Sequence, residues 1–300
     1  MGFANVGPAV TGGGAAELGR AAEEAGFDSL WTVEHVVVPA GYESAYPYSR
    51  SGKMAGGMED FDLPDPLVWL AYVAAATDTL RLATGIVILP QRNPLILAKE
   101  AASLDVLSGG RFVLGVGAGW LAEEFAALGV PFEDRGDRTD EDIRALRVLW
   151  SDGPAAFEGA TTSFEPVYSR PRPVRGIIPI VVGGHSKRAA RRAGELGDGF
   201  FPNHPSHERV AELIAHARRC AETAGRDPDA LEITVGSKPD AGVIERWAEI
   251  GADRVVVGNL GVDGVRIFGE QVIAAWHDAE ARVSGWDSAV QEVPVNAAGG

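Results

Sequence analysis

The sequence contains little cysteine, little positive charge and no long hydrophobic run. Its single cysteine, Cys220, cannot close a disulfide within the chain, so cysteine usage gives no sign of an oxidising compartment. No stretch of about 18 apolar residues free of charge occurs, so no membrane-spanning helix is predicted. The first basic residue is Arg20, and the segment before it lacks the basic region of a secretory signal. These absences predict a cytoplasmic protein.

The shortage of positive charge also limits the partners. The 300 residues include 42 acidic and 27 basic side chains, a formal net charge of −15. Nucleic acids and anionic membranes are bound through basic surfaces, so neither is expected as a main partner. Hydrophobic residues make up 46% and charged residues 23%, which is typical of a globular protein with a substantial core. A small-molecule substrate is therefore expected.

Short, almost continuously apolar runs alternate with amphipathic runs along the chain. Such apolar runs are typical of parallel strands that are covered on both faces. The predicted strands are 2–5, 29–33, 82–88, 112–116, 180–182, 199–201, 231–236 and 254–257. The predicted helices are 15–25, 66–77, 94–107, 140–150, 187–196, 208–224, 243–250 and 268–283. Eight strand–helix pairs favour an α/β fold of the (β/α)8 (TIM barrel) type, with a doubly wound sheet as the alternative.

Two segments interrupt this repeat as insertions, one after the second strand and one before the fifth. Residues 36–65 follow the carboxyl end of a strand, and we interpret them as a lid over a substrate. Residues 151–178 contain a predicted hairpin around Phe157–Phe164 and then a run rich in proline and arginine. We expect one domain over 1–285 and a loosely ordered tail over 286–300.

Glycines at the end of the 112–116 strand suggest a ligand site. Gly115, Gly117 and Gly119 would let the backbone approach a flat or anionic ligand without a Cβ in the way. The dinucleotide-binding fingerprint Gly-x-Gly-x-x-Gly requires a small residue three positions after Gly117. Trp120 stands there, so a Rossmann fold is not predicted. A flexible turn without a ligand is the alternative.

A second glycine pair lies before a predicted helix. Gly183 and Gly184 end a strand, and Ser186 stands where the helix would be capped. Free N–H groups at the helix start, with Lys187 or Arg188 nearby, could bind a phosphate. A plain capped turn with solvated basic residues explains the same pattern.

Ionisable residues follow two other strands. His35 would lie at the barrel mouth and could transfer protons near neutral pH, although a lone histidine at a strand end is more often structural. Glu34 could orient His35 or pair with an arginine. Arg92 could hold a carboxylate or a phosphate. His204 and His207 look like a loop and cap rather than zinc ligands, and no metal site is predicted.

Taken together, several motifs resemble the luciferase-like monooxygenase superfamily, and most closely its branch that uses the deazaflavin coenzyme F420. They are Gly26-Phe-Asp-Ser-Leu-Trp31, Glu34-His35, Thr84-Gly-Ile86, Arg92-Asn-Pro94, Leu107-Ser-Gly-Gly-Arg111, Gly115-Val-Gly-Ala-Gly119, Val182-Gly-Gly184 and Gly197-Asp-Gly199. These matches occur in the family's order over roughly residues 1–260. The resemblance implies a (β/α)8 barrel with the cofactor ring in its mouth and a non-proline cis peptide at Gly85-Ile86. It assigns cofactor contacts to Thr84, Gly85, Ile86, Arg92, Gly117, Gly119, Val182, Gly183, Gly184, His185 and Ser186.

The resemblance also implies catalytic roles. His35 matches a strand-end histidine that donates a proton or contacts substrate, and Glu34 stands where the family has aspartate. Some members have a catalytic glutamate just after the fourth-strand glycines, but Trp120 occupies that position, and Glu123 and Glu124 come later. The implied activity is hydride transfer between F420 C5 and a small organic substrate. The alternatives are an FMN-dependent monooxygenase using O2 and a catalytically silent flavin-binding barrel. A homodimer is expected.

Coenzyme F420 is a polyanion, so a chain of charge −15 would need local positive charge to bind it. We expect the following residues to gather mostly on the catalytic side: Arg50, Lys53, Arg92, Arg170, Arg172, Arg175, Lys187 and Arg188. Added salt should then weaken cofactor binding.

Overall fold

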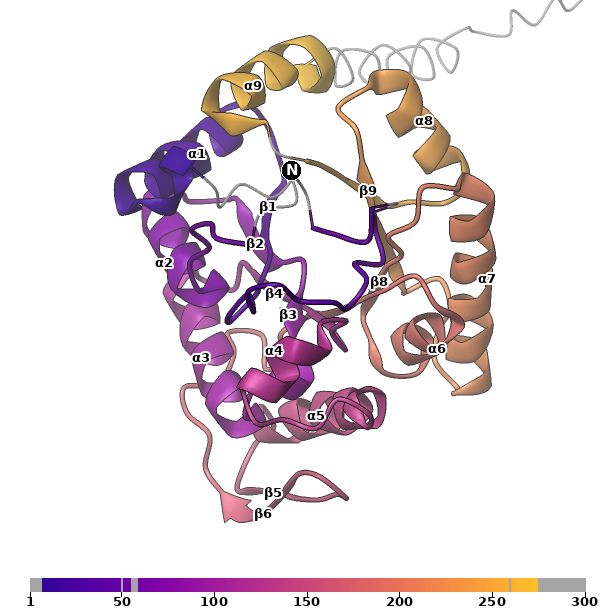
Figure 1. Cartoon of the computed structure of the whole chain (residues 1–300). Helices are drawn as coiled ribbons and strands as arrows, with labels where there is room; N and C mark the ends of the chain where they lie inside the picture. Colours follow the sequence, from indigo (N-terminus) through magenta and orange to yellow (C-terminus); the bar gives the residue numbers. More distant parts are fainter. Residues whose placement is uncertain (1–6, 50, 55–58, 259, 275–300) are drawn as a thin grey trace, which may run out of the picture.

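The computed structural model describes residues 7–49, 51–54, 59–258 and 260–274 of the chain. Its parallel strands are β1 (Ser29–Thr32), β2 (Arg81–Thr84), β3 (Val87–Ile88), β4 (Phe112–Gly117), β7 (Ile180–Gly183), β8 (Gly199–Phe201), β9 (Glu232–Ser237) and β10 (Arg254–Val257). They follow the order β1-β2-β4-β7-β8-β9-β10, and β3 also pairs with β4. Figure 1 looks down the resulting nearly closed barrel and shows helices around it. The predicted TIM-barrel class is confirmed.

Side chains link the two end strands of this sheet. No backbone ladder joins β10 to β1 within the described ranges. The guanidinium of Arg254, at the start of β10, donates to Asp28 Oδ2 just before β1 at 2.9 Å, and it also bonds Glu232. The predicted first strand, 2–5, lies outside the described residues, as does the predicted tail, 286–300.

Several of the helices begin at residues whose side chains cap them. The described helices are α1 (Gly12–Glu24), α2 (Pro66–Ala76), α3 (Pro94–Leu107), α4 (Ala122–Ala127), α5 (Arg135–Leu149), α6 (Lys187–Leu196), α7 (His207–Thr223), α8 (Ala241–Glu249) and α9 (Gly261–Phe268). Asp65, Asn93 and Ser186 accept hydrogen bonds from the first-turn N–H groups of α2, α3 and α6. Proline at the first position of α2 and α3 costs no hydrogen bond, because that N–H has no partner within the helix. The predicted starts of both helices, at residues 66 and 94, are therefore correct.

Three predicted elements needed correction. The predicted strand 82–88 is divided into β2 and β3, because the Thr84 hydroxyl donates to Gly115 O and accepts from Gly115 N and so replaces the backbone ladder. The helix predicted from Asp140 begins at Arg135. The helix predicted from Phe268 is wrong at its start, because α9 begins at Gly261 and continues as a π turn over Gly269–Ile273.

The barrel interior is packed with side chains. Trp31, Ala83, Val113, Val181, Phe201 and Val256 form a buried cluster contributed by six strands. The rings of Trp31 and Phe201 meet edge to face at 5.4 Å between centroids. A larger apolar core lies between the strands and the surrounding helices. A filled interior leaves the strand ends as the place for chemistry.

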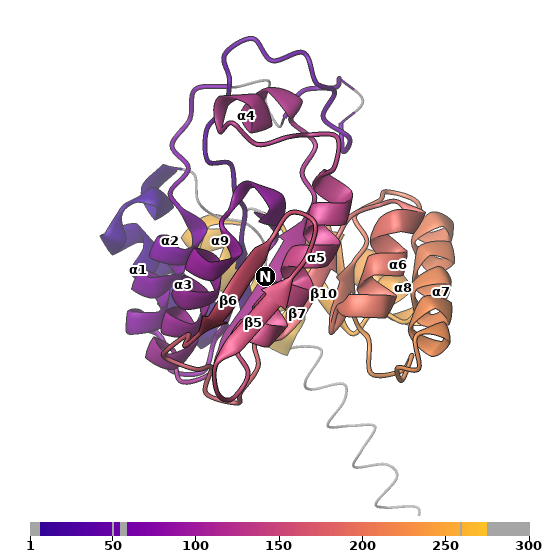
Figure 2. The same ribbon diagram turned by 90° about the horizontal axis from the view of Figure 1, so that it is seen from below.

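The two insertions lie in different places. The described residues of the 36–65 segment, which we call the mouth loop, lie with α4 beyond one end of the barrel (Figure 2). The second insertion forms the antiparallel hairpin β5 (Ala155–Glu158) and β6 (Ser163–Val167), which confirms the predicted hairpin. It lies along the outside of the barrel near α5 (Figure 2). Among the described helices, none is long and apolar enough to span a membrane.

Candidate functional site

The side chain of Ile86, which lies between β2 and β3, packs against the carboxyl ends of β4 and β7. The Gly85–Ile86 peptide is cis, as the family resemblance implied. A Cβ added at Gly117 would lie 2.6 Å from Ile86 Cδ1, and one at Gly183 would lie 2.7 Å from Ile86 Cγ2. These glycines therefore make room for Ile86, whereas the sequence analysis interpreted Gly117 as making room for a ligand. Ile86 is held as an apolar floor between two neighbouring strand ends.

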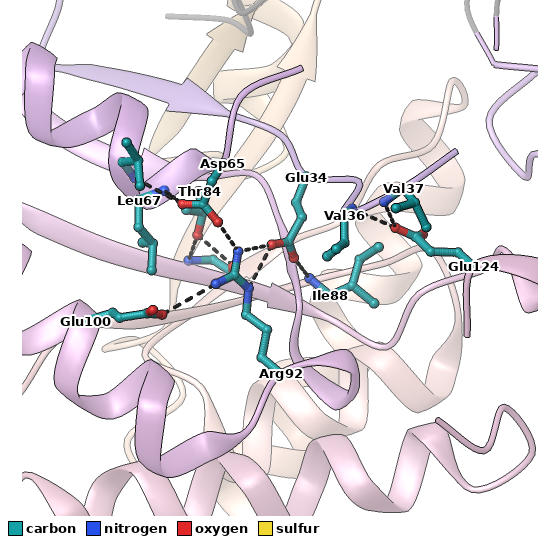
Figure 3. Close-up of polar contacts among 12 residues, drawn as sticks. Glu34, Val36, Val37, Asp65, Leu67, Thr84, Ile88, Arg92, Glu100 and Glu124 are labelled. Atoms are coloured by element: carbon teal, nitrogen blue, oxygen red, sulfur yellow. Dashed lines mark hydrogen bonds and ion pairs between the residues drawn. The ribbon is translucent and has the colours of Figure 1, made fainter. Parts of the chain in front are cut away.

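His35 lies just beyond β1 and is held by a residue that the sequence analysis did not assign to the site. Its Nδ1 lies 2.9 Å from Glu124 Oε2, and the Glu124 side chain is fully buried. Because a carboxylate only accepts, Nδ1 carries the proton and Nε2 is left for a substrate. Glu124 Oε1 also accepts from the N–H of Val36 at 2.7 Å and of Val37 at 3.3 Å (Figure 3). Trp120 packs edge-on against the imidazole, at 5.9 Å between centroids.

Glu34 pairs with an arginine and not with His35, which was the second of the two roles considered for it. Its carboxylate bonds Arg92 and accepts from Ile88 N at 2.6 Å (Figure 3). Arg92 also donates to Asp65 Oδ2 at 2.6 Å and reaches Glu100 at 3.5 Å. Burial raises the pKa of Glu34, and the charge of Arg92 opposes that rise. The network ties the end of β1 to the starts of α2 and α3, and it already surrounds Arg92 with carboxylates.

The turn between β7 and α6 suits an anion. Gly184 has φ 142°, and a Cβ there would lie 2.7 Å from that of Ala189, so only glycine fits. Ser186 caps α6 with a 3.2 Å hydrogen bond from Ala189 N, which confirms the predicted cap. The buried Nδ1 of His185 has no hydrogen-bond partner among the described residues. First-turn N–H groups and the helix dipole favour negative charge at this turn.

Positive charge surrounds this turn, partly from residues that the sequence did not indicate. Burial, and then the positive charge of Arg188, lower the pKa of Arg135. Burial, and then His204 and Arg209, lower the pKa of His185. The turn therefore fits a phosphate group, and the apolar Ile86 floor beside it fits a flat ring. Arg135 and Arg209 were missed because they lie far from the glycines in the sequence.

The expectation that the other cations gather at the mouth is wrong for three arginines. Arg170, Arg172 and Arg175 precede β7, and residues before a parallel strand lie at its amino end, opposite the mouth. Arg172 pairs there with Asp152, just after α5. Arg50 lies outside the described residues. Lys187 is exposed in the first turn of α6, at the mouth end of that helix.

Aromatic side chains of the mouth loop cross the barrel opening. Tyr46 packs against Trp120 and Tyr48, and Tyr48 packs against His185 at 5.2 Å between ring centroids. Tyr42, also in this loop, is buried, and its hydroxyl accepts a hydrogen bond from the N–H of Met54. The loop thus spans from β1 to the β7–α6 turn, as expected of a cover over the mouth.

A second carboxylate holds the mouth loop from α4. Glu123 Oε1 accepts from the N–H of Glu43 at 2.7 Å and of Ser44 at 2.9 Å. The Ser44 hydroxyl and these backbone groups lower the pKa of Glu123 to about 2. Two successive glutamates of one short helix therefore anchor the loop and His35. The sequence could have shown this only through the unusual pair of acids that follows Trp120.

The histidines considered as metal ligands serve other roles. His204 Nδ1 accepts from the N–H of Ser206, which caps α7, and the ring of His207 stacks on Trp247. Within the described parts of the chain, no group of three or more His, Cys, Asp or Glu side chains is placed to hold a metal ion.

Comparison with known proteins identifies the family. The model of the luciferase-like monooxygenases matches residues 4–242, and the chain belongs to that family. An uncharacterised protein of Mycobacterium tuberculosis is 31% identical over 244 residues, covering 81% of this chain and 86% of its own.

Relatives with named activities differ in cofactor. An F420-dependent glucose-6-phosphate dehydrogenase of Kineococcus radiotolerans is 30% identical over 74% of this chain and 62% of its own length. An FMNH2-dependent dimethylsulfone monooxygenase of Pseudomonas putida is 32% identical over 66% of this chain and 54% of its own. The chain is therefore similar to oxidoreductases and monooxygenases that use either cofactor.

Solved structures share the fold. An F420-dependent secondary alcohol dehydrogenase, bound to an F420–acetone adduct, superposes with a TM-score of 0.73 at 22% identity, over 88% of this chain and 94% of that one. The F420-dependent tetrahydromethanopterin reductase of Methanopyrus kandleri also has a TM-score of 0.73, at 18% identity, over 91% of this chain and 98% of that one.

Proposed function

We propose that this protein is an F420-dependent oxidoreductase that transfers a hydride between C5 of the deazaflavin and a small organic substrate at the barrel mouth. The observation that carries the proposal is the His35–Glu124 pair, 2.9 Å apart just beyond the end of β1. Reduction of a carbonyl-like group requires a proton as well as a hydride, and an oriented imidazole can supply it. The F420-dependent relative supports the choice of cofactor.

Different residues of this chain would hold the cofactor, transfer the proton and exclude water. The Gly183–Gly184 turn, the α6 N–H groups and Arg188 would hold the phosphate, with Ile86 beneath the ring. His35 Nε2 would donate the proton to the substrate, or accept it in the reverse direction, while Glu124 stabilises the imidazolium. The mouth loop would exclude water above them.

Fluorescence titration with purified F420 tests the proposal. We expect saturable binding, and turnover of a carbonyl or alcohol substrate that falls by about a hundredfold or more in His35→Ala. Absence of F420 binding at tens of micromolar (roughly a 6–7 kcal/mol binding free energy) would remove it. Binding with no turnover on any substrate would instead support a silent flavin-binding barrel.

The FMN-dependent relative supports a second candidate, an FMN-dependent monooxygenase that uses O2. Oxygen consumption that depends on added reduced FMN, with no binding of F420, would favour it. In either assay, His35→Ala tests the imidazole itself: loss of turnover with unchanged cofactor binding would show that the imidazole takes part in the reaction.

We also propose a cytoplasmic homodimer. Val68 and Tyr72 on α2 and Ile96 and Leu107 on α3 are more than half exposed. The two helices pack side by side on the outside of the barrel (Figure 1). Large apolar side chains gathered on neighbouring helices favour burial against a second copy. The single cysteine agrees with a reducing compartment.

A further inference from the structure

A cleft of about 340 Å³ lies between the start of α3, helix α5 and the β5–β6 hairpin. Its walls are residues 90–95 before and within the start of α3, residues 129–131 between α4 and α5, one face of α5, and the hairpin turn 161–163. Its size is at the lower end of the range for sites that bind small molecules. The β5–β6 insertion, which the proposed redox activity does not use, therefore encloses a separate space.

The hairpin wall is fixed to α5 by directed hydrogen bonds. Glu141 accepts from the N–H groups of Ala160 at 3.1 Å, Thr161 at 2.9 Å and Thr162 at 2.5 Å. A Cβ at Gly159 would stand 2.1 Å from Glu141 Oε1, so only glycine permits this approach. The Thr162 hydroxyl donates to Asp142 Oδ1 at 2.8 Å. A wall held in this way is preformed and does not need to be ordered by a ligand.

Three side chains that line the cleft carry unsatisfied polar atoms. Gln91 Oε1 and Nε2, Arg138 Nε and Asp142 Oδ2 are shielded from solvent and have no hydrogen-bond partner within the described ranges. Asp142 is only 1% exposed. Buried polar groups are nearly always paired, so four unpaired atoms on one cleft call for a partner from outside the chain. They comprise two donors and two acceptors.

The arginines of the cleft are already paired with carboxylates. Arg138 bonds Asp134 at 3.1 Å, and the Arg92 guanidinium is held by Glu34 and Asp65. Asp142, one helical turn after Arg138 on α5, accepts from the Thr162 hydroxyl. An anionic ligand would therefore bring a further negative charge beside Asp142 without a free cation, which is costly away from water.

We propose that this cleft binds a neutral polyhydroxylated molecule of about the size of a monosaccharide. A hydroxyl both donates and accepts, so adjacent hydroxyls can satisfy the amide of Gln91 together with Arg138 Nε and Asp142 Oδ2. Pro90, Pro94 and Val130 offer an apolar surface to the C–H face of such a ring. The site is independent of the proposed redox activity, because neither His35 nor the β7–α6 turn contributes to it.

Titration by saturation-transfer NMR with D-glucose, D-mannose and myo-inositol, using the full chain, tests the proposal. We expect millimolar binding of at least one of these probes. Gln91→Leu and Asp142→Asn should each weaken it by about tenfold, the loss expected for one hydrogen bond to a buried polar group. Gln271→Leu and Asp263→Asn, the same changes at exposed positions, should leave it unchanged. Thermal unfolding of each variant confirms that it is folded.

Several results would overturn the assignment. No binding of any probe up to about 50 mM would do so, since that limit corresponds to a binding free energy of only about 2 kcal/mol. Binding that Gln91→Leu and Asp142→Asn leave intact, but that His35→Ala abolishes, would place the sugar in the barrel mouth. Stronger binding of a zwitterion such as L-glutamine than of any polyol would refute the neutral ligand class.

Discussion

At the residue scale, Glu34 and Glu124 show how similar side chains take different roles. Glu34 follows β1 directly, yet its carboxylate bonds Arg92 and the Ile88 N–H. Glu124 is distant in the sequence, yet it meets His35 and the loop backbone. The position of Glu34 after β1 and that of Glu124 on the short helix α4 determine which partner each carboxylate meets.

Glu124→Gln tests the positioning role of this residue. The amide oxygen can still accept from Val36 and Val37, so the loop should stay anchored, but the imidazolium of His35 loses its charged partner. We expect kcat to fall by about tenfold to a hundredfold, with an unchanged cofactor Kd and an unchanged KM. A loss of cofactor binding that accompanies the fall in kcat, or no fall at all, would mean that Glu124 has only a structural role.

Asp142 should make stability depend on pH. Burial raises its pKa from 3.8 to about 6, against the opposing effects of the Thr162 hydrogen bond and Arg138. A carboxyl with a raised folded pKa contributes stability below about pH 4 and loses that contribution as the pH rises through about 6.

Asp142→Asn should therefore raise the free energy of unfolding at pH 8, by at most about 3 kcal/mol, and change it little at pH 4. Urea unfolding at the two pH values measures this, with Asp263→Asn at an exposed position as the control. A gain of equal size at both pH values would contradict the buried-charge explanation.

At the element scale, β4 is shaped by glycines that have different neighbours. A Cβ at Gly115 would stand 1.8 Å from the backbone oxygen of Thr84, whereas one at Gly117 meets the flexible end of Ile86 at 2.6 Å. The backbone of Thr84 cannot move aside for an added Cβ, whereas the end of the Ile86 side chain can.

We expect Gly115→Ala to lower the free energy of unfolding by about 3 kcal/mol or more, and Gly117→Ala to remain folded but lose cofactor affinity by about tenfold. Circular dichroism melting and F420 titration separate the two effects. A fully stable Gly115→Ala protein would show that the close approach of β2 and β4 is not required.

Prediction of the elements succeeded where local chemistry marks an end. The bounds of α3 and α6 were predicted correctly because Asn93 with Pro94, and Ser186, cap them locally. The start of α9 was predicted incorrectly because its preceding residue makes no side-chain cap bond. Helix α4 was missed because six residues carry too little periodicity, although it supplies both glutamates that hold the mouth loop and His35.

At the scale of the whole molecule, the apolar face of α2 and α3 predicts a dimer. Tyr72→Glu and Ile96→Glu place charges on that face without touching the buried core. We expect light scattering to report about twice the 31.6 kDa chain mass for the unmodified protein and a monomer for the double variant. A monomeric unmodified protein at micromolar concentration would refute the interface.

The distribution of charge over the molecule should make binding of the proposed cofactor depend on salt. We expect the Kd for F420 to rise by about tenfold between about 0.05 and 0.5 M NaCl, because screening weakens the cations around the β7–α6 turn. Arg188→Ala should reduce this dependence, while Arg172→Ala, at the opposite end of the barrel, should not. Equal effects of both variants would indicate that only net charge matters.

The alternation of strands and helices in the sequence favoured a barrel over a doubly wound sheet, and local patterns located the strand ends that carry His35 and Gly183 and the capped start of α6. These follow from local rules of periodicity, capping and glycine geometry, which act over a few residues. The three-dimensional fold was needed to show that Glu124 partners His35, that Glu34 partners Arg92, and that the arginines before β7 lie away from the mouth. Such pairings depend on which distant segments the nearly closed barrel brings together, and a single sequence contains no local signal for that.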